Sequence, residues 1–198
     1  MSAAELACRE DVRACGDVDN LLHVIWAFSK DFSGSGLRVG CLWSRNAALN
    51  RSMHNLGYFC AVSNYVQNVL AAALEDAECI DAYLVQNRRR LAAQAKLLCV
   101  GLEAAHVPFV QPTAGLFCWV DLSGSLLAQS VEGERALWQQ LLEEKKLLLT
   151  PGADCHAPRH GWFRACFASV SEEAIEEATN RLGDFIRGEV RSFVKALP

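Results

Sequence analysis

The sequence lacks the features of several protein classes. Its 198 residues include 19 Lys and Arg against 23 Asp and Glu, a formal net charge of −4. A protein that binds nucleic acid neutralises phosphates with basic residues, so nucleic acid is not an expected partner. No stretch approaches the ~18 apolar residues that span a bilayer. Charged residues interrupt the first 20 positions, so neither a membrane segment nor a signal peptide is predicted.

Paired cysteine motifs are also missing. The nine cysteines are scattered, no C-x-x-C occurs, and an odd number cannot all pair. Cys99, Cys118 and Cys166 lie within apolar stretches, where a free cysteine behaves as a small core residue. This pattern predicts a protein of a reducing compartment, and we expect it in the cytoplasm.

What the sequence does have is a globular composition, 52% apolar and 21% charged, which excludes intrinsic disorder. The apolar run 21–28 predicts a strand buried on both faces, as in a parallel sheet. A Ser/Gly turn and a second strand at 39–43 follow. Helical composition continues over 46–75, with a break expected at Gly57, and over 76–105.

Shorter elements follow the long helix. Strands are predicted at 115–121, 147–149 and 162–167, with an amphipathic helix at 132–146 and a final helix capped by Ser171. We find no internal repeat and no low-complexity tract. The predicted fold class is α/β, with sheet material before the long helix and a smaller α+β unit after it.

Lys30 is the first candidate catalytic residue. It ends the predicted buried strand, where α/β sheets place ligands and where desolvation favours an amine nucleophile. Hydroxyls at Ser29, Ser33 and Ser35, flexible glycines and Arg38 suit a phosphate. An amine beside a phosphate cradle suggests pyridoxal phosphate. The alternative is a surface lysine on a Ser/Gly turn.

Arg164 is the second candidate site residue. Alternation places Trp162, Arg164 and Cys166 on one face of a strand, and Phe163, Ala165 and Phe167 on the other. An arginine in such an apolar strand needs a partner. That partner is either a group of the protein itself or the carboxylate of a substrate, held by two parallel hydrogen bonds.

Two segments resemble a known family. Ser29–Gly40, SKDFSGSGLRVG, resembles the cofactor-lysine motif of fold type I pyridoxal-phosphate enzymes, which include the class I and II aminotransferases. The eight-residue step from Lys30 to Arg38 is the family's step from cofactor lysine to phosphate-binding arginine. Pro151–Ala168 is similar to the family's carboxylate-binding block, in the form found in 1-aminocyclopropane-1-carboxylate synthases. The resemblance extends from Leu21 onward.

The resemblance implies a fold, a cofactor and an activity. Residues 1–80 would be the C-terminal part of the pyridoxal-phosphate-binding large domain, and 81–198 the linking helix and small C-terminal domain. The chain would belong to an amino-acid-transforming transferase or lyase that uses pyridoxal 5'-phosphate and forms a homodimer. Lys30 would be catalytic, Ser29, Lys30 and Arg38 would bind the cofactor, and Arg164 would bind the substrate carboxylate. The motifs do not separate transamination from elimination.

The sequence departs from the family in two ways. Ala27 stands where the family often has a serine that bonds the phosphate. The family's ring-stacking aromatic residue, its acid at the pyridine nitrogen and its groups at the ring oxygen precede the lysine by more than the 29 residues found here. We therefore expect a partial chain: a fragment, a truncated product or an incomplete gene model. The alternative function is a catalytically silent partner of a full-length homologue.

A zinc-binding module is a third hypothesis. Cys155, His156, His160 and Cys166 lie close in sequence, and the two histidines form an H-x3-H pair. Structural zinc sites use paired units such as C-x2-4-C, which these cysteines do not form. No metal site is therefore predicted.

Overall fold

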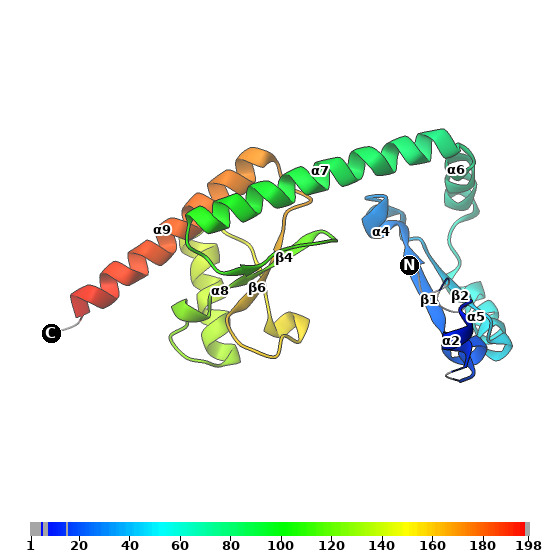
Figure 1. The fold of residues 1–198 in the computed structure, drawn as a ribbon, viewed down its shortest axis with the longest axis horizontal. Coiled ribbons are helices and arrows are strands. Elements are labelled where there is room, and N and C mark those ends of the chain that lie inside the picture. Colours follow the sequence, from blue (N-terminus) through cyan, green and yellow to red (C-terminus); the bar gives the residue numbers. More distant parts are fainter. Residues whose placement is uncertain (1–4, 6–7, 15, 197–198) are drawn as a thin grey trace. The chain divides into compact units, whose positions relative to one another are not determined.

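A computed structural model describes residues 5, 8–14 and 16–196 of the chain. The chain divides into two compact units, unit 1 (Met1–Val85) and unit 2 (Gln86–Pro198). Figure 1 colours unit 1 from blue to cyan and unit 2 from green to red. The long helix α7 (Ala77–Ala104) contributes residues to both units.

Unit 1 is built on a β-hairpin. Strands β1 (His23–Ala27) and β2 (Gly40–Ser44) pair antiparallel, with Ala27 opposite Gly40. The predicted parallel-sheet strand is therefore wrong in its pairing, and also in its burial, because no residue of β1 is buried. The physical reason is that β1 has a single strand neighbour in this sheet. A continuous apolar run is buried on both faces only when other elements cover both.

Unit 1 also contains helices before, between and after the two strands. They are α2 (Glu10–Arg13), α3 (Val18–Leu21), α4 (Phe28–Asp31), α5 (Ala47–Cys60) and α6 (Asn64–Glu75). Helix α5 begins where the Asn46 side chain accepts a hydrogen bond from the backbone N–H of Leu49, at 2.9 Å. It continues through Gly57, so the predicted break there is wrong, and the chain leaves the helix at Ala61 instead.

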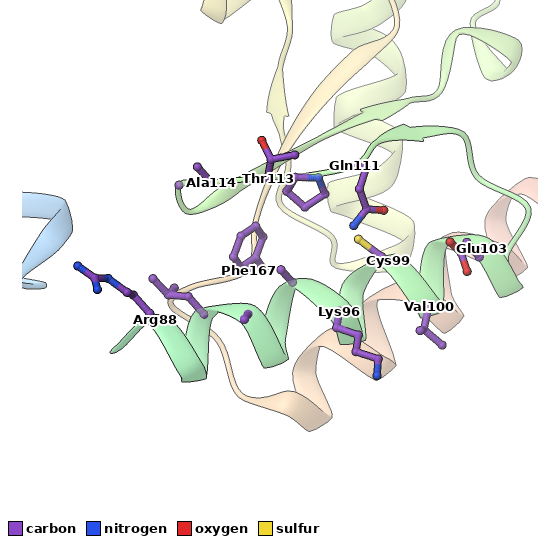
Figure 2. Close-up of a pocket in the computed structure, with 14 residues that line it drawn as sticks. Arg88, Lys96, Cys99, Val100, Glu103, Gln111, Thr113, Ala114 and Phe167 are labelled. Atoms are coloured by element: carbon purple, nitrogen blue, oxygen red, sulfur yellow. The ribbon is translucent and has the colours of Figure 1, made fainter. Parts of the chain in front are cut away.

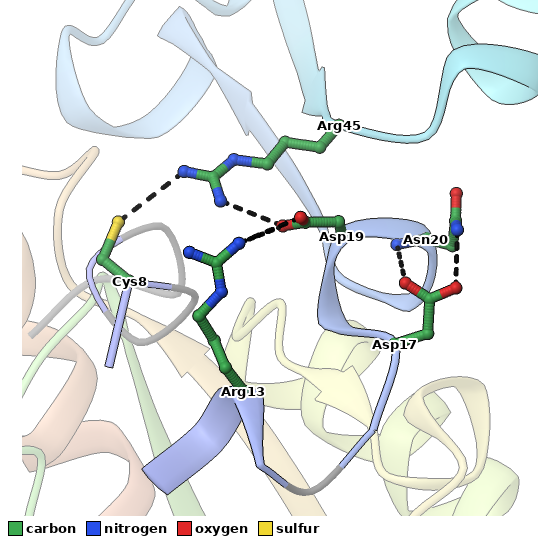
Figure 3. Close-up of polar contacts among 6 residues, drawn as sticks. All are labelled: Cys8, Arg13, Asp17, Asp19, Asn20 and Arg45. Carbon is green, nitrogen blue, oxygen red and sulfur yellow. Dashed lines mark hydrogen bonds and ion pairs between the residues drawn. The ribbon is translucent and has the colours of Figure 1, made fainter. Parts of the chain in front are cut away.

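Ion pairs join the N-terminal segment of unit 1 to the end of β2 (Figure 3). The Asp19 carboxylate accepts hydrogen bonds from Arg13 and Arg45, both at 2.9 Å. The hydrogen bond from Arg45 is the main reason that the pKa of Asp19 lies below its usual value. Asp17 caps α3 by accepting from the backbone N–H of Asn20. These contacts fix the approach of the chain to β1.

Unit 2 contains a four-stranded antiparallel sheet in the order β3-β4-β6-β5. Its strands are β3 (Phe109–Val110), β4 (Phe117–Asp121), β5 (Thr150–Pro151) and β6 (Trp162–Cys166). The helices of this unit are α8 (Val131–Lys145), α9 (Glu172–Ala196) and the second part of α7. The segment 147–149 is not a strand, and β5 begins at Thr150, where the sequence predicted a strand end.

The core of unit 2 lies on one face of this sheet. Paired residues of the two central strands, Cys118 with Ala165 and Val120 with Phe163, are buried there. Apolar side chains from all three helices join them in one cluster: Leu98 and Leu102 of α7, Leu137 and Leu141 of α8, and Ile175, Leu182 and Phe185 of α9. The sheet has a second face, which carries Phe117, Trp119 and Arg164, all half-buried.

Several sequence predictions are confirmed and others need correction. The long helix, the strands at β4 and β6, the helix at α8 and the Ser171 cap of α9 are present, the cap through a 3.3 Å bond from the N–H of Ala174 to the Ser171 hydroxyl. Cys99 and Cys118 are buried as expected, but Cys166 is exposed because it ends β6 on the face away from the core. Cys15 lies outside the described residues.

Candidate functional site

Lys30 lies on the connection between the two strands of unit 1. It is in the single turn of α4, directly after β1, and the connection is closed by a hydrogen bond from the N–H of Phe28 to the carbonyl of Val39, at 3.1 Å. Its side chain is exposed. The desolvated lysine that the sequence predicted is therefore not present in this structure, since the strand before it is not covered on both faces. Ser29, beside it, is half-buried.

Aromatic rings hold this connection on the hairpin. Trp26 of β1 packs edge-on against Phe28, with ring centroids 4.7 Å apart, and Phe28 contacts Phe32 at 5.4 Å. Phe32 in turn stacks on Tyr83 of α7, at 5.5 Å and 4°. Such ring pairs add to the free energy gained by apolar burial. Because Phe28 and Phe32 flank Lys30 in sequence, the cluster fixes the backbone from which the lysine extends.

Arg38 lies near the other end of the same connection. Its backbone is left-handed, with φ +53°, and its Nη1 donates to the carbonyl of Ser35 at 2.8 Å. Gly34, just before Ser35, lets the backbone pass close to α4, because a Cβ there would lie 3.2 Å from the carbonyl oxygen of Phe28. The structure thus brings Ser29, Lys30 and Arg38 onto one hairpin connection, with further guanidinium N–H groups of Arg38 available for an anion.

Arg164 stands in β6 of unit 2, on the sheet face opposite to the core. It lies across from Trp119 of β4 and Thr150 of β5. Its guanidinium carbon is 4.4 Å from the ring centroid of Phe117, a cation–π contact. Its Nη2 donates to the Thr150 hydroxyl at 3.4 Å. The alternation predicted from the sequence is confirmed, because Phe163, Ala165 and Phe167 are all buried on the other face.

The guanidinium of Arg164 keeps one buried donor unused. Its Nε is inaccessible to solvent and has no hydrogen-bond partner among the described residues. Within the same part of the chain it forms no ion pair with a carboxylate. A buried N–H without an acceptor costs free energy. A carboxylate approaching edge-on would satisfy this donor together with a neighbouring Nη, in the bidentate geometry that guanidinium favours.

Two of the cavities among the described residues of unit 2 lie near residues discussed above. One, of about 450 Å³, is bordered by Thr150 and Arg164, by the segment 146–149 and by residues of α7 and α9. The other, of about 630 Å³, lies between α7 and the segment 111–115 (Figure 2). Cys99 borders it, and burial raises the pKa of this thiol. Of the four predicted site residues only Arg164 borders either of these cavities, and its guanidinium contacts Phe117 on the sheet face away from the core.

Sequence reasoning missed the residues that support Arg164. Thr150 lies just after the predicted strand 147–149, and Phe117 lies within the predicted strand 115–121 with no role assigned to it. The signal that finds them is register, since Thr150 is paired with Arg164 and Phe117 with Cys166, its neighbour on the same face. Register depends on which strands pair, and a single sequence does not give the pairing.

The zinc hypothesis has no site in the structure. Among the residues described, no three His, Cys, Asp or Glu side chains form a group that could hold a metal ion. Cys155 and His156 lie in and after a short 3-10 turn, whereas Cys166 ends β6. In the same described part of the chain, no helix has the length and apolarity needed to cross a membrane.

Comparison with known sequences shows the family. The model of the family described as aminotransferase class I and II matches residues 4–182. 1-Aminocyclopropane-1-carboxylate synthase 9 of Arabidopsis thaliana is 36% identical over 170 residues, and synthase 4 of Oryza sativa subsp. japonica is 39% identical over 178 residues. Each match covers 86% of this chain and 36% of the relative. The chain therefore spans little more than a third of the length of these relatives.

Solved structures show the same fold. An aromatic aminotransferase from Pyrococcus horikoshii matches with a TM-score of 0.77 and 19% identity, over 90% of this chain and 46% of that one. An aspartate aminotransferase from Thermotoga maritima matches with a TM-score of 0.65 and 27% identity, over 83% and 40%. The chain thus has the fold of part of a pyridoxal-phosphate-dependent aminotransferase. The chain belongs to the aminotransferase class I and II family.

Proposed function

We propose that this chain provides the cofactor lysine and the substrate-carboxylate receptor of a pyridoxal 5'-phosphate enzyme that transforms amino acids, an aminotransferase or a relative of the 1-aminocyclopropane-1-carboxylate synthases. Family membership supports the class of reaction. The observation that carries the proposal is the buried Nε of Arg164, which has no partner among the described residues and suits a ligand carboxylate. An α-amino acid supplies such a group.

The connection between β1 and β2 fits the cofactor. Lys30 offers an exposed amine for the cofactor's aldehyde, and Ser29 and Arg38 offer a hydroxyl and a guanidinium for its phosphate. Gly34 lets the backbone approach closely between them. When bound, pyridoxal phosphate supplies an electron sink for the bond that breaks at the α-carbon of the substrate.

The chain's own residues have two tasks in this function. With the cofactor bound, the Nζ of Lys30 would take the proton from the α-carbon of the substrate and return it, because a neutral primary amine is a suitable base. Arg164 fixes the carboxylate at two points, which limits rotation of the substrate about its α-carbon. Orientation of this kind decides which bond at the α-carbon is broken.

A catalytically silent partner is the second candidate, and one observation favours it. Ala27, which precedes α4, has no side chain that can hydrogen bond, although the family often places a phosphate-binding serine there. One charge-assisted hydrogen bond contributes about 1.5–3 kcal/mol, so its loss weakens cofactor binding. Such a chain would associate with a full-length homologue without binding the cofactor itself.

Assembly and location belong to the same proposal. A homodimer is supported by the family and by large apolar side chains that unit 1 leaves exposed: Tyr58, Phe59 and Tyr65 on α5 and α6. Cytoplasmic location is supported by Cys99 and Cys118, which are packed in unit 2 as free thiols.

Covalent trapping tests the proposed function. The full chain is incubated with pyridoxal phosphate, treated with borohydride, and digested for peptide mass spectrometry. We expect the cofactor on the peptide containing Lys30, its loss in Lys30→Ala, and its retention in Lys96→Ala, which removes an exposed lysine of α7. Arg38→Ala should raise the cofactor concentration needed to label Lys30 about tenfold, because the contact with the phosphate is lost. Labelling that is spread over many lysines and unchanged in Lys30→Ala would exclude the proposal that the chain carries the cofactor lysine. In that case, association with a full-length homologue would support the proposal of a catalytically silent partner.

A further inference from the structure

A buried glutamate of α8 holds both ends of the loop between β5 and β6. The side chain of Glu134 is fully buried. One of its carboxylate oxygens accepts from the N–H of Ala153 at 2.8 Å, and the other accepts from the N–H of Gly161 at 2.7 Å. These two residues lie just after β5 and just before β6. A buried carboxylate is tolerated only when it is hydrogen bonded in this way.

The same helix holds the chain on the other side of β5. One turn after Glu134, the Nε1 of Trp138 donates to the carbonyl of Leu149 at 2.8 Å. Residues four apart lie on one face of a helix, so both contacts come from the same side of α8. Together they bracket the two residues of β5, Thr150 and Pro151.

β5 is also held by its pairing with β6, which ends at a hydrogen bond from the N–H of Gly152 to the carbonyl of Trp162, at 2.7 Å. It is a two-residue edge strand, and its second residue, Pro151, has no N–H to donate to a neighbour. At its end Gly152 lies so close to β6 that a Cβ there would be 2.5 Å from the carbonyl oxygen of Trp162. Gly152 therefore connects the loop that Glu134 binds to the end of β5, and a shift of the loop would act on β5 through this residue.

That shift would reach Arg164 directly. Thr150 lies opposite Arg164 in the register, and its hydroxyl accepts the hydrogen bond from Nη2. The Thr150 hydroxyl accepts from Nη2, while Nε stays buried without a partner among the described residues. The direction in which Arg164 presents its donors thus depends on where α8 holds β5.

We propose that Glu134 is a positioning residue for the carboxylate receptor: by binding the backbone of Ala153 and Gly161, it sets the register of β5 and with it the orientation of the Arg164 guanidinium. The inference rests on the proposed role of Arg164 in binding an amino-acid carboxylate. It assigns to Glu134 no contact with substrate or cofactor.

The test compares two Glu→Gln variants of the full chain. Glu134→Gln keeps the size of the side chain, but its NH2 group faces one of the two backbone N–H groups and cannot accept from it. Glu144→Gln is the matched control, since Glu144 is an exposed residue of the same helix. The Nε–H signal of Arg164 in a ¹H–¹⁵N spectrum, assigned by its loss in Arg164→Lys, reports the guanidinium itself. Acetate is titrated as the carboxylate probe.

We expect Glu134→Gln to move the Arg164 Nε–H signal by more than its linewidth and to weaken acetate binding about tenfold, whereas Glu144→Gln changes neither. A lower thermal midpoint for Glu134→Gln with an unchanged Arg164 signal would overturn the inference, because the glutamate would then be purely structural. If wild type shows no response to acetate, the receptor function of Arg164 fails, but the signal still decides whether Glu134 positions it.

A second variant covers the case in which Glu134→Gln does not fold. Trp138→Phe keeps an aromatic ring against the core but removes the hydrogen bond to the carbonyl of Leu149. We expect it to move the Arg164 signal in the same direction by a smaller amount. An Arg164 signal at the wild-type position in folded Trp138→Phe would contradict the dependence of Arg164 on the α8 contacts with β5.

Discussion

Strand β1 of unit 1 and strand β6 of unit 2 have the same length, and each leads to or carries a candidate site residue. Their surroundings differ. In β6 Phe163 is fully buried and Ala165 nearly so, beneath three helices. In β1 no residue is buried, and Ile25 is 82% exposed. Among the described residues of unit 1, Phe28 is the only buried one.

The difference teaches how each unit holds its candidate residues. Unit 2 fixes Arg164 through a packed core below the sheet and hydrogen bonds along its edge. Unit 1 fixes the Lys30 connection through hairpin hydrogen bonds and a chain of aromatic rings that ends at Tyr83. Two strands without a covering layer are marginally stable in water. We therefore expect the backbone of unit 2 to be the more protected of the two.

The same substitution in each unit should give the largest contrast. Phe163→Ala removes a fully buried ring and is expected to cost about 3–5 kcal/mol of unfolding free energy. Phe59→Ala, in α5, removes a ring that is 83% exposed, and should change stability by no more than about 0.5 kcal/mol. Urea unfolding and unit-resolved hydrogen exchange measure both. Equal losses of unfolding free energy for the two variants would contradict the difference in packing between the two units.

The next largest difference is expected in the rates at which the cysteines of the two units react. Burial raises the pKa of Cys118 in unit 2 to about 11 and also raises that of Cys99. Only about one Cys118 thiol in 1,000 is then ionised at about pH 8, and the thiolate is the reactive form. We expect iodoacetamide to modify Cys118 at least 100-fold more slowly than the exposed Cys41 and Cys60 of unit 1, roughly in line with that ionised fraction.

The pH dependence provides the control for this experiment. Because its pKa is raised, the reaction of Cys118 should accelerate about tenfold for each pH unit below about 11 while the fold is intact. Peptide mass spectrometry after short labelling times gives the rate at each cysteine. Comparable rates for Cys118 and Cys60 at about pH 8 would show that the core of unit 2 opens freely.

The two strands also show what sequence can predict. The alternation of β6 correctly gave the faces of Phe163 and Arg164, because period two fixes the face of each residue whatever its neighbours are. The continuous apolar run of β1 gave the strand but not its partner or its burial, since those depend on elements elsewhere. Thr150 and Glu134 were missed for a related reason. Their roles come from strand register and from a helix packed against a loop, which local patterns do not encode.

The smallest effect is expected in the N-terminal ion pairs of unit 1. The pKa of Asp19 is lowered chiefly by the hydrogen bond from Arg45, with Arg13 contributing. A carboxyl group whose pKa is lower in the folded state stabilises the fold above its unfolded value, about 3.9. That stabilisation is lost as the pH falls through the lower folded value. Because all three side chains are more than one third exposed, water and salt weaken it further.

Asp19→Asn should therefore loosen only the segment that Asp19 holds. At about pH 7 we expect changed amide signals for residues 16–21 and at Arg45, unchanged signals in unit 2, and a smaller effect in about 1 M salt. The difference from wild type should vanish below the folded pKa of Asp19, where the wild-type carboxylate is also neutral. Asp81→Asn, an exposed change in the part of α7 within unit 1, is the matched control and should leave residues 16–21 unaffected. A response to Asp19→Asn that spreads into β6 would contradict the independence of the two units and would join the stability of the Lys30 connection to that of the Arg164 sheet.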